Sequence, residues 1–148
     1  MKIYIISDSH GDRGNAEKIA AMMQLDDKLI FLGDGLGDVE FLKGENVYKV
    51  AGNCDFAPFD PCSMTPVIAG RKFYITHGHK DRVKSDLFRF SMSALEKNAD
   101  VACFGHTHIP YCEYEYGMLM INPGSLGQGC YAVIEVKDNE LSPKLMKL

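Results

Sequence analysis

The chain alternates short runs of apolar residues with polar segments, and the apolar runs have the lengths expected of β-strands. Several runs are continuous and rich in β-branched residues, which is typical of strands buried on both faces. Residues 3–6, for example, read Ile-Tyr-Ile-Ile. On this pattern we expect strands at residues 3–6, 29–32, 47–51, 66–69, 72–75, 101–104, 111–116, 118–121, 131–136 and 141–146.

Apolar residues at helical spacing predict two amphipathic helices between these strands, at residues 14–24 and about 83–97. A short helix is expected at 38–43. The segment 56–66 contains three prolines and is expected to form an irregular loop. Alternating strands and helices, followed by consecutive strands, predict a mixed α/β domain with more than one sheet. No internal repeat or linker interrupts the pattern, so we expect a single domain over residues 1–148.

Polar clusters follow five of the predicted strands, and all five histidines of the chain lie in such clusters. Ligands of α/β proteins gather at the carboxyl ends of strands, so we expect these clusters to converge. Each cluster taken alone has a plainer interpretation as a turn or a helix cap, and only the set points to a site. The clusters are Asp8 with His10, Asp34, Asn53, His77 with His79, and His106 with His108.

The segment Gly105-His106-Thr107-His108 holds two of the histidines one residue apart. Side chains at i and i+2 of an extended chain point to the same side, so both imidazoles can face one site. Gly105 allows a tight turn of the backbone just before them. This arrangement, in a chain with few histidines, favours metal binding over a surface role.

Two carboxylates, an amide oxygen and several imidazoles, without a matching set of cysteines, indicate divalent ions such as manganese, iron or zinc. The set is too large for one tetrahedral ion and suits two. Two such ions can share a hydroxide and hold a phosphoryl group for in-line attack, and they prefer an anionic substrate. The expected reaction is therefore phosphoester hydrolysis that needs no side-chain nucleophile.

The composition of the chain narrows the possible classes of function and location. The net charge of −4 argues against a broad surface for nucleic acid or anionic membrane. The apolar run near the N-terminus is too short for a signal peptide or a membrane span. The cysteines are odd in number, scattered and without a C-x-x-C pair, which fits a reducing cytoplasm. They lie at Cys54, Cys62, Cys103, Cys112 and Cys130.

In this order, Asp8-x-His10, Gly33-Asp34, Gly52-Asn53, His77 and Gly105-His106-x-His108 resemble the motifs of the calcineurin-like metallophosphoesterase superfamily. The short length is most similar to the small YfcE-type phosphodiesterases. The resemblance covers roughly residues 1–125 and implies a four-layer αββα sandwich of two mixed sheets packed face to face and flanked by helices.

The same resemblance implies residue roles and a cofactor. It assigns Asp8, His10 and His108 to one metal ion, Asn53, His77 and His106 to a second, and Asp34 to both. It also implies that Asn53, Asp34 and His106 are catalytic. The cofactor expected from it is a pair of divalent ions, manganese first, with nickel, zinc, iron or magnesium as alternatives.

The sequence departs from the family at Cys54, where many members have a histidine that can protonate the leaving oxygen. A thiol is a weak hydrogen-bond donor with a pKa near ~8.5, and is a poor substitute for that acid. Cys54 is interpreted either as a substrate-binding residue or as a small packing residue. His79 either contacts substrate or braces its loop. Asn122 is expected in a turn, and Arg13 is expected to be solvated.

The expected function is hydrolysis of small phosphodiesters. The alternative is a protein-binding scaffold of the same fold, like the retromer subunit, whose site has decayed. A nuclease acting on long nucleic acid is less favoured because the chain is acidic. A homo-oligomer stays open, since the Tyr- and Met-rich stretch 111–120 fits either an interface or a sheet core.

Overall fold

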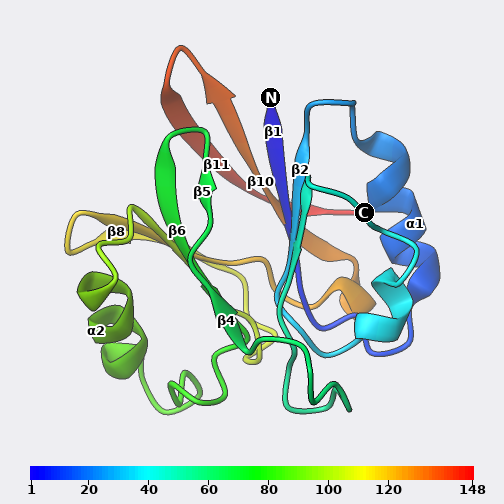
Figure 1. Cartoon of the computed structure of the whole chain (residues 1–148), viewed down its shortest axis with the longest axis horizontal. Coiled ribbons are helices and arrows are strands. Elements are labelled where there is room, and N and C mark those ends of the chain that lie inside the picture. Colours follow the sequence, from blue (N-terminus) through cyan, green and yellow to red (C-terminus); the bar gives the residue numbers. More distant parts are fainter.

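The computed structural model describes residues 1–148, and its centre is a pair of β-sheets packed face to face (Figure 1). The strand order of the first sheet is β11 (Glu140–Lys147), β10 (Cys130–Lys137), β1 (Lys2–Ile6), β2 (Lys28–Phe31) and β3 (Val47–Lys49). In this sheet β1, β2 and β3 are parallel. Strand β10 pairs antiparallel with β1, and β11 pairs antiparallel with β10.

The second sheet is also mixed. Its central strands β6, β7 and β9 are parallel, whereas β4 and β8 pair in antiparallel fashion at the edges and β5 pairs with β6. The order is β4 (Ser63–Met64), β6 (Arg71–Thr76), β7 (Val101–Cys103), β9 (Met118–Asn122) and β8 (Tyr111–Glu115), with β5 at Val67–Ile68.

One α-helix covers the outer face of each sheet, which completes four layers (Figure 1). Helix α1 (Arg13–Met22) packs on the first sheet and α2 (Phe88–Glu96) on the second. Two short 3-10 helices, η1 (Leu36–Val39) and η2 (Leu126–Gln128), lie in the connections. The predicted αββα sandwich with two mixed sheets is confirmed.

The continuous apolar runs arise because each central strand is buried on both faces. In β1, Ile3 and Ile5 belong to the apolar cluster between the sheets, whereas Tyr4 and Ile6 belong to the cluster under α1. Side chains alternate between faces along a strand, so four consecutive apolar residues supply both layers. All four are less than a twentieth exposed, and these strands therefore have no solvated face.

The predicted helix over 83–97 is wrong at its start, because α2 begins at Phe88. Residues 78–87 form turns instead, in which the buried Val83 packs beside Gly78 and its N–H donates to the carbonyl of Gly78. The carboxylate of Asp86 accepts the N–H of Phe88 and stabilises the helix start. An apolar residue that is buried in a turn thus continued the apparent helical pattern.

Smaller differences occur elsewhere. The short helix expected at 38–43 is the 3-10 helix η1, and the expected loop 56–66 contains the two-residue strand β4. In the stretch 111–120, strand β9 is fully buried while Tyr114 of β8 is largely exposed. Met118 and Met120 of that stretch are therefore sheet core. No helix of the protein combines the length and apolar character needed to cross a membrane.

Candidate metal centre

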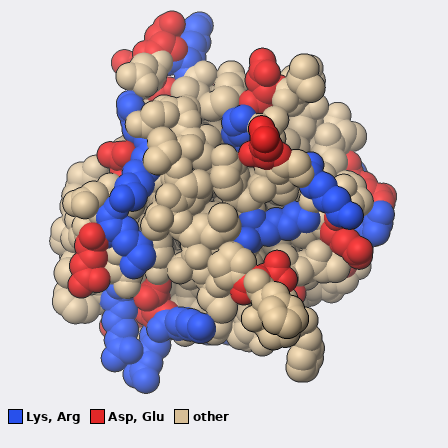
Figure 2. All heavy atoms as spheres, viewed as in Figure 1, with Lys and Arg blue, Asp and Glu red and all other residues tan.

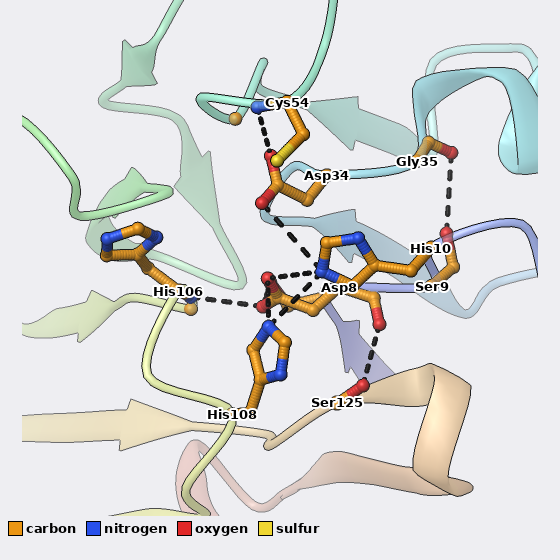
Figure 3. A network of polar contacts seen from close by, with 12 residues as sticks. Asp8, Ser9, His10, Asp34, Gly35, Cys54, His106, His108 and Ser125 are labelled. Carbon is orange, nitrogen blue, oxygen red and sulfur yellow. Dashed lines mark hydrogen bonds and ion pairs between the residues drawn. The ribbon is translucent and has the colours of Figure 1, made fainter.

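The polar clusters that follow the strands meet at one end of the sandwich, where the carboxyl ends of both parallel strand sets lie (Figures 1 and 3). The first sheet supplies residues that follow β1, β2 and β3, and the second supplies residues that follow β6 and β7. The site is therefore built across both sheets. In chain order its residues are Asp8, His10, Asp34, Asn53, His77, His106 and His108.

One group of ligand-type side chains consists of Asp8, His10 and His108, whose ligand atoms lie within 4.8 Å of one another. Nε2 of His108 lies 3.1 Å from Oδ1 of Asp8 and 3.2 Å from Nε2 of His10. Nε2 of His10 in turn lies 3.5 Å from Oδ1 of Asp8. Figure 3 shows the two imidazoles directed at this carboxylate.

A second group consists of Asp34, His77 and His106, again within 4.8 Å. Nε2 of His77 lies 3.2 Å from Oδ2 of Asp34, 3.1 Å from Nδ1 of His106 and 2.9 Å from Oδ1 of Asn53. Oδ2 of Asp34 is also 3.9 Å from Nε2 of His10. Asp34 therefore stands between the two groups.

The hydrogen bonding of His77 indicates what kind of partner suits the second group. Its Nδ1 lies 2.7 Å from the carbonyl of Leu32, which can only accept, so Nδ1 carries a proton. In the neutral ring Nε2 is then a bare lone pair, facing the oxygens of Asn53 and Asp34. Acceptors that converge in this way need a proton or a cation between them. Histidines that bind metal ions commonly make this second bond to a backbone carbonyl.

The charges of the site also fit divalent cations. Asp8 and Asp34 are buried, at 0% and 3% exposure, and their only charged partners are histidines. Buried carboxylates are costly without a compensating positive charge. The donor set of oxygen and imidazole nitrogen suits ions such as manganese. The residues present therefore fit a pair of divalent metal ions.

The backbone at the centre adopts an unusual conformation. Asp8, His10, Asp34, His106 and His108 all have positive φ, between 44° and 68°. Residues other than glycine rarely adopt this left-handed region, and such strain tends to collect at functional sites. Bonds between loops hold it in place: the N–H of Asp8 donates to Gly33, that of His10 to the carbonyl of Asp34, and that of His106 to Oδ2 of Asp8.

Asp55 fixes the position of Asp34, although the sequence offered no role for it. Its carboxylate accepts four backbone N–H groups, at 2.8 to 3.1 Å. The donors are Asp34, Gly35, Leu36 and Gly52. These bonds join the loop after β2 to the loop after β3. At Gly52 a Cβ atom would overlap Oδ1 of Asp34, so only glycine fits there.

Two polar side chains, at the end of β9 and just after it, brace the site on the other side. The amide of Asn122 donates to the carbonyl of Gly105 and to Oγ1 of Thr107, both at 3.0 Å, and its oxygen accepts the N–H of Gly124. Asn122 is therefore the last residue of β9 rather than a turn residue; its side chain stabilises the turn that follows and also holds the loop of His106 and His108. The hydroxyl of Ser125 donates to the carbonyl of Asp8 (Figure 3).

The remaining candidates lie around this centre. Cys54 is exposed, and its Sγ lies within 4.8 Å of ligand-type atoms of His10 and Asp34. The ring of His79 lies 5.4 Å from that of His77, and its buried Nδ1 has no hydrogen-bond partner. Arg13 pairs with Glu17 and is about half exposed, outside the two ligand groups.

The surroundings of the ionisable groups of the site shift their pKa values in different directions. Burial would raise the pKa of Asp34, but hydrogen bonds from His77 and Cys54 outweigh it and hold that pKa well below its usual range. Burial opposes a charge on His77, yet its bonds and charge interactions with Asp34 and Asp8 raise its pKa above 6.5. Burial, then the charges of His77 and Lys84, lower the pKa of His106 to about 4. Burial and His77 likewise lower the pKa of His79.

These pKa values predict that metal binding displaces a proton. The raised pKa of His77 means that the metal-free ring holds a proton more tightly than a free imidazole does. Manganese titrated into metal-stripped protein should therefore release protons, and affinity should fall as the pH drops because protons compete for Nε2. Calorimetry in two buffers of different ionisation enthalpy measures the release. It should shrink at pH 8.5 and in a His77→Ala variant. Equal heats in both buffers at pH 6.5 would contradict the prediction.

The bonds of Asp55 predict that Asp55→Asn weakens metal binding without touching a ligand. An amide nitrogen would face backbone N–H donors, so Asp34 would lose its fixed position. We expect a roughly 10–100-fold loss of metal affinity and a loss of about 1–3 kcal/mol in unfolding free energy. Metal titration and urea unfolding measure the two. Asp60→Asn, an exposed residue of the same loop, should change neither. Unchanged affinity in Asp55→Asn would show that the loop holds Asp34 without it.

Comparison with known proteins agrees with this geometry. The sequence model of the calcineurin-like phosphoesterase superfamily domain matches residues 1–139. Probable metallophosphoesterase YsnB of Bacillus subtilis is 39% identical over 127 residues, which cover 85% of this chain and 75% of that protein. Phosphodiesterase YfcE of Escherichia coli K12 is 27% identical over 153 residues, which cover 85% of this chain and 79% of that protein.

A solved structure gives the same result. The crystal structure of a predicted phosphoesterase from Streptococcus pneumoniae superposes with a TM-score of 0.84 at 26% identity, covering 99% of this chain and 88% of that one. The family model spans nearly the whole chain, and the Bacillus relative is similar over most of its own length. This chain belongs to the calcineurin-like phosphoesterase superfamily.

Proposed function

We propose that this protein is a two-metal phosphodiesterase that hydrolyses small phosphodiesters. The observation that carries the proposal is the pair of ligand groups on either side of Asp34, each with its ligand atoms within 4.8 Å. Membership of the superfamily and the similarity to Phosphodiesterase YfcE support it. A single tetrahedral ion would leave part of this donor set unused.

The proposed ligand assignment follows the two groups. Asp8, His10 and His108 hold one ion, and His77, His106 and Asn53 hold the other. Asp34 contributes to both, because Oδ2 lies 3.2 Å from Nε2 of His77 and 3.9 Å from Nε2 of His10. Manganese is the proposed ion, since hard oxygen and imidazole ligands both suit it.

Bound divalent ions would lower the pKa of a water molecule and neutralise charge on a phosphoryl group. The residues of the chain that we propose to be catalytic are Asn53, Asp34 and His106. Asn53 is exposed and directs Oδ1 at His77, and one N–H of its amide donates to Sγ of Cys54, which leaves the second N–H to donate to a phosphate oxygen. His106 is neutral at physiological pH because its pKa is about 4, so one of its ring nitrogens keeps a lone pair that can bind a metal ion. Asp34 is held ionised and fixed in place.

The surroundings of the centre favour small substrates of varied shape. His10 and His108 are each 38% exposed, and Asn53 and Cys54 are exposed. The metal centre itself is therefore open to solvent. The chain carries a net charge of −4, which does not favour the long basic track that an extended nucleic acid needs.

The first test is metal-dependent hydrolysis. Metal-stripped protein, reloaded with manganese, zinc, nickel or magnesium, is assayed on bis-(p-nitrophenyl) phosphate and p-nitrophenyl phosphate, with metal content measured. We expect hydrolysis of the diester only after reloading. Asp34→Asn and His106→Ala should each lower kcat/KM by at least about 100-fold, because each removes a group that organises the charge of the transition state. Asp26→Asn, an exposed carboxylate outside the site, should be unaffected.

Other outcomes would revise the proposal. Bound metal without turnover on either ester would favour the protein-binding scaffold. Faster hydrolysis of the monoester would replace diesterase with monoesterase activity. If the protein binds none of the four metals, the proposed two-metal site is wrong.

Cys54 suggests which esters this site hydrolyses well. Partial desolvation, and then the charge of Asp34, raise the pKa of its thiol, so the side chain stays neutral at pH 7 and is a weak donor. Figure 3 shows its sulfur directed toward the carboxylate of Asp34. A site without a strong acid at this position should favour esters with good leaving groups, whose oxygen needs no proton.

This predicts different effects of two substitutions at one position. Cys54→Ala should change kcat/KM by less than about threefold on every ester, since little acid catalysis is lost. Cys54→His should flatten the dependence of rate on leaving-group pKa, as measured on a series of aryl and alkyl phosphodiesters. A large and uniform loss in Cys54→Ala with both metals retained would show that the thiol itself acts in the reaction.

A further inference from the structure

An apolar pocket of about 420 Å³ lies beside the metal centre. Its floor is formed by Phe104 and Val83, which are almost fully buried, and its walls by Leu87, Ile109 and Tyr111. Ile109 is 68% exposed, so the pocket is open rather than filled by the protein itself. The volume lies within the range of small-molecule sites.

The pocket and the metal centre share one short segment of chain. Thr107 and Ile109 line the pocket, whereas His106 and His108, which alternate with them, belong to the two ligand groups. The Cα atom of Thr107 is therefore about 3.8 Å from the Cα atoms of both histidines. The segment 106–109 thus borders the pocket and the metal centre with alternate residues.

The segment is also held rigidly on the pocket side. Oγ1 of Thr107 accepts the N–H of Ile109 at 3.1 Å and the amide of Asn122 at 3.0 Å. The same amide holds the carbonyl of Gly105, just before His106. One set of bonds therefore fixes the wall of the pocket and the two imidazoles together, so the distance between the pocket and the centre is preset.

The chemistry of the pocket suits a flat apolar group attached to an anion. The ring of Phe104 in the floor lies 5.9 Å from that of Tyr111 in the wall and 4.7 Å from that of Phe90, which packs against it outside the pocket, so the floor is aromatic. Lys84 lines the same pocket, and its charge acts on His106. Figure 2 shows Lys and Arg side chains gathered over the segment between β6 and α2, which contains the exposed Lys80, Arg82 and Lys84. Lys84 therefore places a positive charge at the edge of an apolar depression.

We propose that this pocket is a subsite that receives a flat, apolar ester group of the substrate, such as an aromatic ring, while Lys84 at its rim attracts the phosphate anion. The proposal rests on the proposed phosphodiesterase function and adds a substrate class to it. Aryl and other ring-bearing phosphodiesters are then better substrates than alkyl diesters with the same leaving group. The preference is set by Leu87, Ile109 and the aromatic floor.

The test compares two diesters that share a leaving group, p-nitrophenyl phenyl phosphate and p-nitrophenyl methyl phosphate. Burial of the phenyl ring should raise kcat/KM for the first by about tenfold relative to the second. Ile109→Ser should lower this ratio roughly threefold or more, through the phenyl ester alone. Using the change of the ratio between variants cancels the intrinsic reactivity of the esters. Lys84→Gln should raise KM for both esters and leave the ratio unchanged.

Val67→Ser is the matched control, because Val67 is a similarly exposed aliphatic residue, 66% exposed, on β5. It should change neither rate. If both diesters are hydrolysed and Ile109→Ser leaves the ratio unchanged, the subsite is wrong and the phosphodiesterase function stands.

A binding measurement keeps the two proposals separate when turnover is absent. Zinc-loaded protein with labelled methyl groups is titrated with phenylphosphonate and with methylphosphonate and followed by NMR. Phenylphosphonate should shift the methyl resonances of Val83, Leu87 and Ile109, and methylphosphonate should not. Such shifts without hydrolysis of either diester would support the subsite while the phosphodiesterase function fails. Absence of the shifts would overturn the subsite.

Discussion

Two buried carboxylates at one end of the sandwich, with only histidines to offset their charge, are the constraint on which the rest of the structure depends. Asp8 follows the central strand of the first sheet and Asp34 follows its parallel neighbour, so pairing of β1 with β2 brings both charges together. The second sheet supplies His77, His106 and His108, which follow the ends of β6 and β7. Face-to-face packing of the sheets is thus what brings acidic and imidazole ligands within reach of each other.

Most of the groups that hold these two carboxylates and the histidines in place are main-chain groups. Asp55 binds four N–H groups of the loops that carry Asp34 and Gly52, and Asn122 binds the carbonyl before His106. Because these partners are main-chain groups, the ligands are positioned by the course of the chain as well as by their own rotamers. This explains how residues with positive φ, such as Asp8 and His106, keep a conformation that an isolated peptide would avoid.

Much of this site could be predicted from the sequence, because its information is local. The run 3–6 is continuous because β1 is buried on both faces, and the polar residue that ends such a run marks the carboxyl edge of the sheet. The residues that hold the site in place could not be predicted in the same way. The role of Asp55 depends on backbone groups about 20 residues away in the chain, and Val83 fits a helical pattern while lying in a turn. Only the folded chain distinguishes these cases.

The position of β1 has a consequence for how the protein is made. This strand lies between β2, which follows it closely, and β10, whose residues 130–137 come near the end of the chain. Asp8 is further tied to Ser125 and to the N–H of Gly127. A chain that emerges from the ribosome therefore cannot form these contacts of β1 and Asp8 until residues 125–137 have been synthesised. The contacts involved span more than a hundred residues, and such long-range contacts slow folding. The side chains of this centre are therefore expected to come together late, after β10 has paired with β1.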